Sequence, residues 1–285
     1  MKEQKEQGRR GLSLLRIFII VIAGAIFLYA AYQLFSYWKE DYASKQDRDQ
    51  LARQAVTVLP TATAPKKQEA SVEHLEETSP QEENTEPEFS LSDTIPLRVD
   101  FDALQAENPD IIAWIYCADT PINYPVAQSE DNQYYLRRLT DGSYNSSGTI
   151  FLDFRNSPDL HDVNSLIYGH NMTNGTMFGT LVEYKDQAYY DEHPELWILT
   201  RECAYRIDLI AGLVTASDSD DYTIFETREE LDAHLQDCVE RSTFVSDFDL
   251  DTVERIVTLS TCSYEYNTAR YVVIGNMLPI AYPAE

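Results

Sequence analysis

The chain has 285 residues, with 22 Lys and Arg against 48 Asp and Glu, and its formal net charge is −26. Its 44% hydrophobic and 12% aromatic residues exclude a wholly disordered chain and allow one or two folded domains. The acidic excess excludes a nucleic-acid binder, which needs a basic face, and four cysteines are too few for a small disulfide scaffold.

Residues 17–38 contain no charge, and this apolar run of 22 residues predicts a transmembrane helix. At about 1.5 Å per residue, the helix spans the ~30 Å hydrocarbon core of a bilayer. Basic residues precede the run and aromatic residues lie near its far end, which favours a cytoplasmic N-terminus at residues 1–16 and an extracellular remainder. The alternative is a cleaved signal peptide, but its apolar region of about 7–15 residues is usually shorter. We therefore expect a single-pass cell-membrane protein that contacts the lipid bilayer through residues 17–38.

Residues 39–96 are expected to form an extracytoplasmic stalk or linker. Its first part, residues 42–58, can continue as a polar helix with a thin apolar stripe at Leu51, Ala55 and Val56. From Pro60 to Pro87 the segment is rich in Pro, Thr, Glu and Gln, and it cannot bury enough apolar area to offset its ordering entropy.

Residues 97–285 are expected to form one mainly β domain. Short runs rich in β-branched and aromatic residues predict eight strands, at 113–117, 122–126, 149–154, 165–170, 196–200, 205–214, 255–261 and 270–277. So many short strands indicate an antiparallel barrel or sandwich. The capping box that starts at Thr227 predicts a helix with Leu231, Leu235 and Val239 on its apolar face, and two further helices are expected at 102–107 and 131–139.

The four cysteines are Cys117, Cys203, Cys238 and Cys262, and an extracellular location leaves two disulfides as one interpretation. Cys262 differs from the others, because it ends a predicted strand and Arg270 begins the next one. If these strands pair as a hairpin, Cys262 and Arg270 face each other across the strands with Cβ atoms about 5 Å apart. A cation at that distance favours a thiolate and offers N–H donors to an oxyanion.

A thiol nucleophile also needs a proton partner, usually a histidine. His170 ends an apolar predicted strand, and the preceding Gly169 is expected to let the backbone turn sharply there. His74 falls in the stalk, and ordinary surface or packing roles are expected for His161, His193 and His234.

Three separated motifs resemble the sortase family. Thr258-Leu-Ser-Thr-Cys262, followed by Arg270 in Ala-Arg-Tyr-Val-Val, is similar to the sortase cysteine signature. Ile167-Tyr-Gly-His-Asn-Met172, with Gly175-Thr-Met-Phe-Gly179 behind it, resembles the histidine motif of class B sortases, and the resemblance extends over residues 97–278. The helix predicted at Thr227 also resembles class B.

The resemblance implies an eight-stranded sortase-type β-barrel with a few peripheral helices, and a cysteine transpeptidase. Cys262 would be the nucleophile, His170 the general acid and base, and Arg270 the stabiliser of the oxyanion or substrate, with Thr261, Ser260 and Asn171 as expected substrate contacts. The implied partners are secreted proteins that carry a C-terminal sorting signal and an amine of the peptidoglycan precursor.

The same residues would also serve an extracellular cysteine hydrolase that does not transfer, and a non-catalytic binding ectodomain is a third interpretation. No cofactor is expected for this chemistry. No His, Cys and Asp cluster shows metal-ligand spacing, so no metal is expected either. If Cys262 is a free thiol, at most one disulfide remains possible, and ordinary buried thiols are favoured for Cys117, Cys203 and Cys238.

Overall fold

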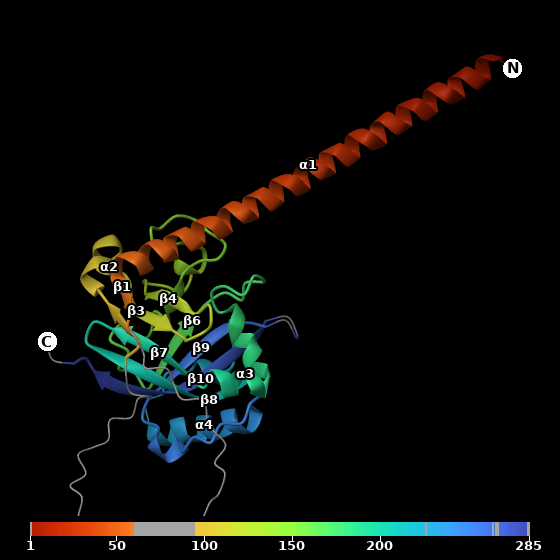
Figure 1. Cartoon of the computed structure of the whole chain (residues 1–285). Helices are drawn as coiled ribbons and strands as arrows, with labels where there is room; N and C mark the ends of the chain where they lie inside the picture. The colour runs from red at the N-terminus through yellow and green to blue at the C-terminus, as the bar shows by residue number, and fades with distance from the viewer. Residues whose placement is uncertain (1, 60–94, 226, 264, 266–267, 284–285) are drawn as a thin grey trace, which may run out of the picture. The chain divides into compact units, whose positions relative to one another are not determined.

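The computed structural model describes residues 2–59, 95–225, 227–263, 265 and 268–283, and the side chains among them from residue 18 onward. The chain divides into two units, residues 1–46 and a compact unit at residues 47–285 (Figure 1). The linker expected from Pro60 to Pro87 lies outside the described residues.

Helix α1 (Lys2–Ala55) provides all the described residues of the first unit. Among the residues that the structure describes, α1 is the one helix that is long and apolar enough to cross a membrane, judged by length and composition. Its large apolar side chains from Phe18 to Trp38 are exposed, which suits contact with lipid rather than with a protein core.

Eight strands of the second unit close into a barrel in the order β10-β8-β7-β3-β4-β5-β6-β9. The strands are β3 (Ile111–Tyr116), β4 (Asn123–Ala127), β5 (Ile150–Leu152), β6 (Asn164–Tyr168), β7 (Glu195–Thr200), β8 (Cys203–Ala216), β9 (Ile256–Cys262) and β10 (Ala269–Ala281). All eight correspond to predicted strands, which confirms the mainly β fold and selects the barrel over the sandwich. The fully antiparallel arrangement expected from the sequence is wrong, because β4 pairs with β5 and β6 with β9 in parallel.

The helices of the second unit are peripheral. The predicted helix at Asp102–Glu107 is confirmed as α2 (Phe101–Glu107), and the capping box at Thr227 opens α4 (Arg228–Arg241). The helix predicted at 131–139 is wrong, because this segment forms only a short 3-10 turn, η2 (Tyr135–Arg137). Here the Asp131 carboxylate accepts hydrogen bonds from the backbone N–H groups of Gln133 and Tyr134, so a local turn competes with a helix. Further short helices are η3 (Gly179–Lys185), α3 (Gln187–Glu192), η4 (Asp220–Tyr222) and η5 (Leu250–Thr252).

The last turns of α1 belong to the compact unit rather than to a stalk. Leu51 and Ala55 are buried in an apolar cluster that also contains Trp114 of β3. Strand β1 (Val56–Val58) then pairs with β2 (Leu97–Val99), so the chain on both sides of the undescribed segment is held together. The unit therefore begins at Asp47, not at residue 97 as the change in composition suggested.

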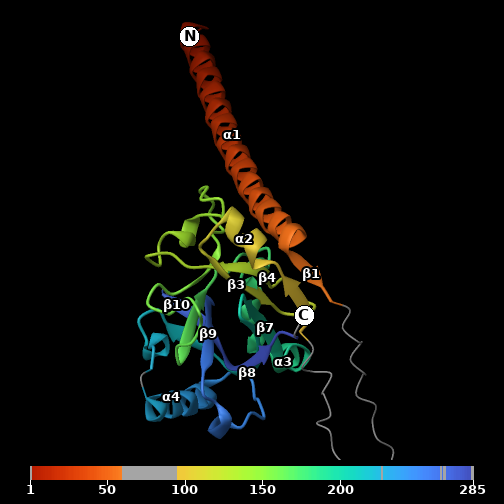
Figure 2. The ribbon, with the colours of Figure 1, turned by 90° about the vertical axis from the view of Figure 1, so that its left-hand side faces the viewer.

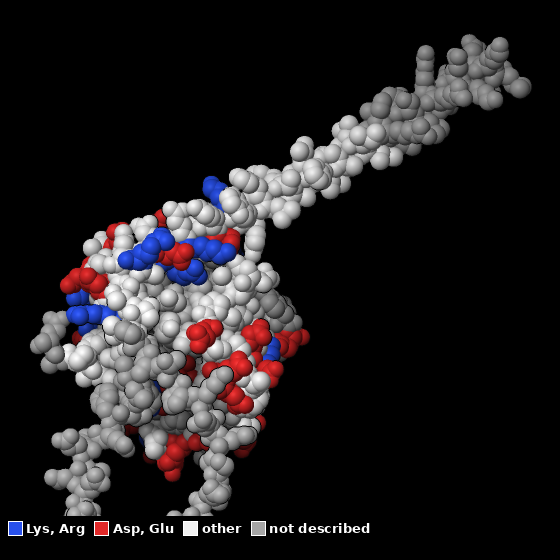
Figure 3. Space-filling model, in the orientation of Figure 1, with Lys and Arg blue, Asp and Glu red and all other residues white. Residues whose placement is uncertain are grey.

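The largest apolar cluster fills the interior of the barrel, and a second one lies under α4. Leu231, Leu235 and Cys238 of α4 pack against β8, β9 and β10, and Figure 2 shows the helix beside these strands. Asp and Glu side chains form several patches on the face of this unit seen in Figure 3, in keeping with the acidic excess of the sequence.

Candidate active site

Three neighbouring strands, β6, β9 and β10, bring the candidate residues to one edge of the barrel. Arg270 of β10 lies directly opposite Cys262 of β9, which confirms the hairpin register expected from the sequence. Strand β6 runs parallel to β9 on its other side, and Tyr168 is its last residue in register, opposite Ser260. His170 and Cys262 each follow two residues after this pair. His170, Cys262 and Arg270 therefore lie at or just past the ends of three adjoining strands.

Side-chain and backbone hydrogen bonds hold the ends of β6 and β9 together. The Thr261 hydroxyl donates to the Gly169 carbonyl oxygen at 2.9 Å, and the Gly169 N–H donates to the Ser260 carbonyl oxygen at 3.1 Å. The Asn171 Nδ2 donates to the Cys262 carbonyl oxygen at 2.8 Å. Hydrogen bonds thus join the two chain segments that carry His170 and Cys262, both just before and just after His170.

Gly169 permits close packing rather than the sharp turn that the sequence suggested. Its φ is not in the left-handed region. A Cβ atom at this position would lie 2.7 Å from Cγ and Cδ2 of the buried Phe178 ring. The Phe178 N–H also donates to the His170 carbonyl oxygen at 3.0 Å, so Phe178 helps to fix the backbone of the candidate histidine.

His170 is half-buried, and its Nε2 atom lies 2.8 Å from the carbonyl oxygen of Leu136 in η2. Burial lowers the pKa of His170 below the usual value of about 6.5, and the charges of Arg137 and Arg270 lower it further, against the opposing effect of the Leu136 hydrogen bond. The ring is therefore mainly neutral at pH 7, and in that form it can accept a proton.

Cys262 and Arg270 are both half-buried at the end of the β9–β10 hairpin. Opposed residues on an antiparallel pair have Cβ atoms about 4.5–5.5 Å apart, so the guanidinium is within reach of a group bound to the sulfur. One Arg270 nitrogen, Nη1, donates to the carbonyl oxygens of Thr268 and Ala269 at 3.3 and 3.0 Å. These contacts hold the guanidinium over its own strand end.

Lys185 connects the β9–β10 loop to η3. Its ammonium forms an ion pair with Glu265 and donates to the Ser263 hydroxyl at 3.1 Å. Hydrogen bonds from Lys185 and Ser263 lower the pKa of Glu265 to about 2. The loop that directly follows Cys262 therefore has an anchor that the sequence did not reveal.

All three expected substrate contacts have hydrogen-bond partners within the domain, and two of them, Ser260 and Thr261, are also buried. Ser260 and Thr261 are 3% and 2% exposed, and the Ser260 hydroxyl lies 2.9 Å from the hydroxyl of Tyr222. These contacts favour a positioning role for both residues, while substrate contact by Ser260, Thr261 and Asn171 stays a prediction. Sequence reasoning missed Tyr222, because nothing in the local sequence of η4 indicates that this tyrosine contacts Ser260.

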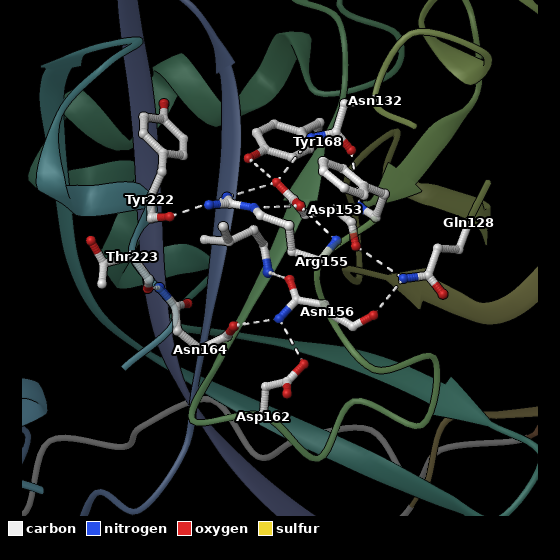
Figure 4. Close-up of polar contacts among 12 residues, drawn as sticks. Gln128, Asn132, Asp153, Arg155, Asn156, Asp162, Asn164, Tyr168, Tyr222 and Thr223 are labelled. Atoms are coloured by element: carbon white, nitrogen blue, oxygen red, sulfur yellow. Dashed lines mark hydrogen bonds and ion pairs between the residues drawn. The ribbon is translucent and has the colours of Figure 1, made fainter. Parts of the chain in front are cut away.

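A polar network, called here the Asp153 network, is centred on the residue that follows β5 and includes Tyr168 of β6 (Figure 4). The Asp153 carboxylate is 0% exposed and accepts hydrogen bonds from Arg155, Asn132 and the Tyr168 hydroxyl. Arg155 also donates to the backbone carbonyl oxygen of Tyr222 at 3.2 Å. The network therefore connects the strand that ends near His170 to the residue that contacts Ser260.

The sortase domain family model matches residues 115–278 of the chain. Sortase B of Listeria monocytogenes is 34% identical over 180 residues, which cover 61% of this chain and 72% of that protein. Sortase B of Staphylococcus aureus is 31% identical over 189 residues, covering 65% of this chain and 77% of the relative.

Solved sortase B structures resemble the fold. A Staphylococcus aureus sortase B–substrate complex and a sortase B complexed with triglycine each superpose with a TM-score of 0.59 at 30% identity, over 64% of this chain and 85% and 86% of theirs. Sortase B of Clostridium perfringens also gives 0.59, at 28% identity, over 63% of this chain and 100% of that one. The match of motif, barrel and sequence shows that this chain belongs to the sortase family of cysteine transpeptidases, in its class B branch.

Proposed function

We propose that this chain is a membrane-anchored transpeptidase that cleaves a C-terminal sorting motif of secreted proteins and transfers them to an amine of the peptidoglycan precursor. The observation that supports the proposal most strongly is the row of strand ends, with Arg270 opposite Cys262 and His170 just past the paired end of β6. Family membership sets aside the non-catalytic ectodomain.

In the first half-reaction, Cys262 is the nucleophile and neutral His170 the base. The imidazole accepts the thiol proton as the sulfur attacks the scissile carbonyl carbon, and the carbonyl oxygen becomes an oxyanion. Arg270 donates hydrogen bonds to that oxyanion. When the intermediate collapses, the C–N bond breaks, protonated His170 gives its proton to the leaving amine, and the acyl group stays on Cys262 as a thioester.

In the second half-reaction, the acceptor amine attacks the thioester carbonyl carbon. Neutral His170 accepts a proton from the attacking nitrogen, Arg270 again donates to the oxyanion, and the C–S bond breaks. The new amide is released, and His170 returns the proton to the sulfur. This cycle restores the starting protonation states, so the chain's own residues suffice for it.

The exposed apolar surface of α1 supports a membrane anchor at residues 17–38. The basic residues before it support a cytoplasmic N-terminus and a catalytic unit outside the cell, in agreement with substrates that are secreted. In this proposal the catalytic unit starts at Asp47, and the last turns of α1 are part of its core.

The alternative is a hydrolase that passes the acyl group to water through the same residues. The relative solved with triglycine favours transfer, because that ligand offers an amine. The full chain in detergent micelles is incubated with sorting-signal peptides from secreted proteins of the same genome, with and without peptidoglycan-type amines, and the products are identified by mass spectrometry. We expect a ligated product that depends on the amine, and hydrolysis alone with every amine would favour the hydrolase.

The same assay tests the residue roles. Cys262→Ala should abolish cleavage, and His170→Ala and Arg270→Ala should each reduce it severely. Cys203→Ala is the matched control, because Cys203 is also a half-buried free thiol and should not be required. Full activity of Cys262→Ala would refute the proposed mechanism.

A further inference from the structure

Three side chains with metal-binding atoms meet beneath the barrel, although their spacing in the sequence does not suggest a site. His234 and Cys238 are four residues apart on α4, so they lie on one face of the helix. Asp221 of η4 reaches the same point from the far end of β8. Cys238 and Asp221 are 0% and 3% exposed, and the His234 side chain is 8% exposed.

The three ligand atoms form a nearly regular triangle. Cys238 Sγ lies 3.4 Å from His234 Nε2, 3.7 Å from His234 Nδ1 and 3.9 Å from Asp221 Oδ1, and His234 Nδ1 lies 3.9 Å from Asp221 Oδ1. Around a tetrahedral Zn²⁺ with bonds of about 2.0–2.3 Å, ligand atoms are about 3.3–3.6 Å apart. A rotation of the imidazole that turns Nδ1 toward the shared point, with small shifts of Cys238 and Asp221, would therefore complete one face of a zinc coordination shell.

The Asp221 carboxylate has one oxygen directed at the cluster and another held by the protein. Oδ2 accepts hydrogen bonds from Thr215, Ser219 at 2.9 Å and Arg241 at 3.2 Å. Oδ1 is the oxygen nearest to Cys238 and His234, and the closest donor of Arg241 is 3.4 Å from it. The outer partners fix the carboxylate in the way that surrounding hydrogen bonds orient metal ligands.

We propose that Asp221, His234 and Cys238 bind one divalent transition metal of the zinc type, with water in the fourth position. The sulfur, nitrogen and oxygen donors select zinc over magnesium or calcium, which prefer oxygen ligands alone. The site lies outside the row of strand ends, and its existence does not depend on the proposed transpeptidase mechanism.

The charges balance when the metal binds. The Cys238 thiol releases its proton to solvent as the metal–sulfur bond forms, so the thiolate and the Asp221 carboxylate together neutralise the two positive charges of the ion. His234 binds as a neutral imidazole. Arg241 keeps Asp237, four residues earlier on the helix, as its own ion-pair partner, so no unpaired charge remains in the buried cluster.

Such a site would attach α4 to the end of β8. Asp221 directly precedes Tyr222, whose hydroxyl contacts Ser260 in the strand that carries Cys262. The metal would therefore stabilise the helix-bearing connection and, through it, one wall of the candidate active site. Its role is structural in this proposal, because none of its ligands belongs to the catalytic row.

The test is a Co²⁺ titration of the full chain in detergent, in the Cys262→Ala background so that the catalytic thiol cannot bind the metal. We expect one Co²⁺ per chain with a thiolate-to-cobalt charge-transfer absorption, and its displacement by Zn²⁺. Cys238→Ala should abolish this absorption, and His234→Ala should weaken it at least tenfold in Co²⁺ affinity. Cys117→Ala and His161→Ala are the matched controls and should retain it.

Absence of the absorption in the Cys262→Ala chain, or its retention after Cys238→Ala, would overturn the proposal. If Cys238→Ala fails to fold, the unfolding temperature of the Cys262→Ala chain with and without Zn²⁺ decides instead, alongside Asp221→Asn. We expect Zn²⁺ to raise this temperature and Asp221→Asn to remove most of the rise. No rise, or an equal rise in Asp221→Asn, would contradict a metal site at these residues.

Discussion

Replacement of Asp153 by asparagine removes a buried charge at the centre of the Asp153 network while it preserves the shape of the side chain. Oδ1 of Asp153 accepts two hydrogen bonds from Arg155, from its backbone N–H and Nε, each at 2.9 Å. Oδ2 accepts three, from Arg155 Nη2, the Tyr168 hydroxyl and Asn132 Nδ2, at 2.9–3.0 Å. In either orientation, the amide NH₂ of asparagine would face at least two of these donors.

The expected loss of stability follows from these contacts. A net hydrogen bond to a charged group contributes about 1.5–3 kcal/mol, and at least two are lost. The Arg155 side chain is 45% exposed, so water replaces part of its contribution and the sum must be discounted. We therefore expect Asp153→Asn to reduce the free energy of unfolding by about 2–3 kcal/mol, a fall of about 4–12 °C in Tm for a unit of this size.

The assay is thermal unfolding of the full chain in detergent, followed by near-UV circular dichroism, with Asp159→Asn as the control. Asp159 forms an ion pair with His161 in which both side chains are about half exposed, and its loss should cost less than about 1 kcal/mol. Equal Tm values for Asp153→Asn and Asp159→Asn would refute the reasoning.

The pH dependence of the same variant gives a second check. Burial raises the pKa of Asp153, but hydrogen bonds from Arg155, Tyr168 and Asn132 outweigh it and hold the pKa below its usual value. Such a group stabilises the fold above its unfolded pKa of about 3.9, and this stability is lost as the pH falls through the folded pKa. The Tm difference between the wild type and Asp153→Asn should therefore shrink below about pH 4.

Two further variants test the surroundings of His170, the proposed general acid and base. Arg137→Gln removes a charge that lowers the pKa of His170, so the acidic limb of the pH profile of kcat/KM should move to higher pH. The control Arg138→Gln should leave this limb in place. An unshifted limb in Arg137→Gln would contradict the role given to the Arg137 charge. Gly169→Ala places a methyl group against the Phe178 ring. This variant should lower the free energy of unfolding by about 1–3 kcal/mol and reduce kcat. Wild-type values of both quantities would show that the ring can move aside.

The strands and the Cys262–Arg270 register could be predicted because they depend on local signals. Short β-branched runs bounded by turn residues fix each strand, and adjacent strands joined by a short loop form a hairpin. The parallel pairing of β6 with β9 is not local, since almost ninety residues separate them in the chain. Without it, no sequence rule places His170 beside Cys262, and here only the resemblance to a family supplied the link.

Other features escaped prediction for related reasons. The composition of residues 47–58 is polar enough to suggest a stalk, but Leu51 and Ala55 find apolar partners in β3. The grouping of Asp221 with His234 and Cys238 depends on how α4 packs against β8, which the spacing in the sequence does not encode. In both cases the role of a few side chains depends on tertiary contacts with other elements of the fold.

The most direct test of the mechanism is the capture of the acyl-enzyme. The full chain is mixed with a cleavable sorting-signal peptide without any amine, quenched in acid, digested and analysed by mass spectrometry. We predict that the fragment containing Cys262 gains the mass of the N-terminal part of the peptide, and that hydroxylamine removes it as the hydroxamate. An acyl group on another residue, or peptide cleavage by Cys262→Ala, would contradict a thioester on Cys262.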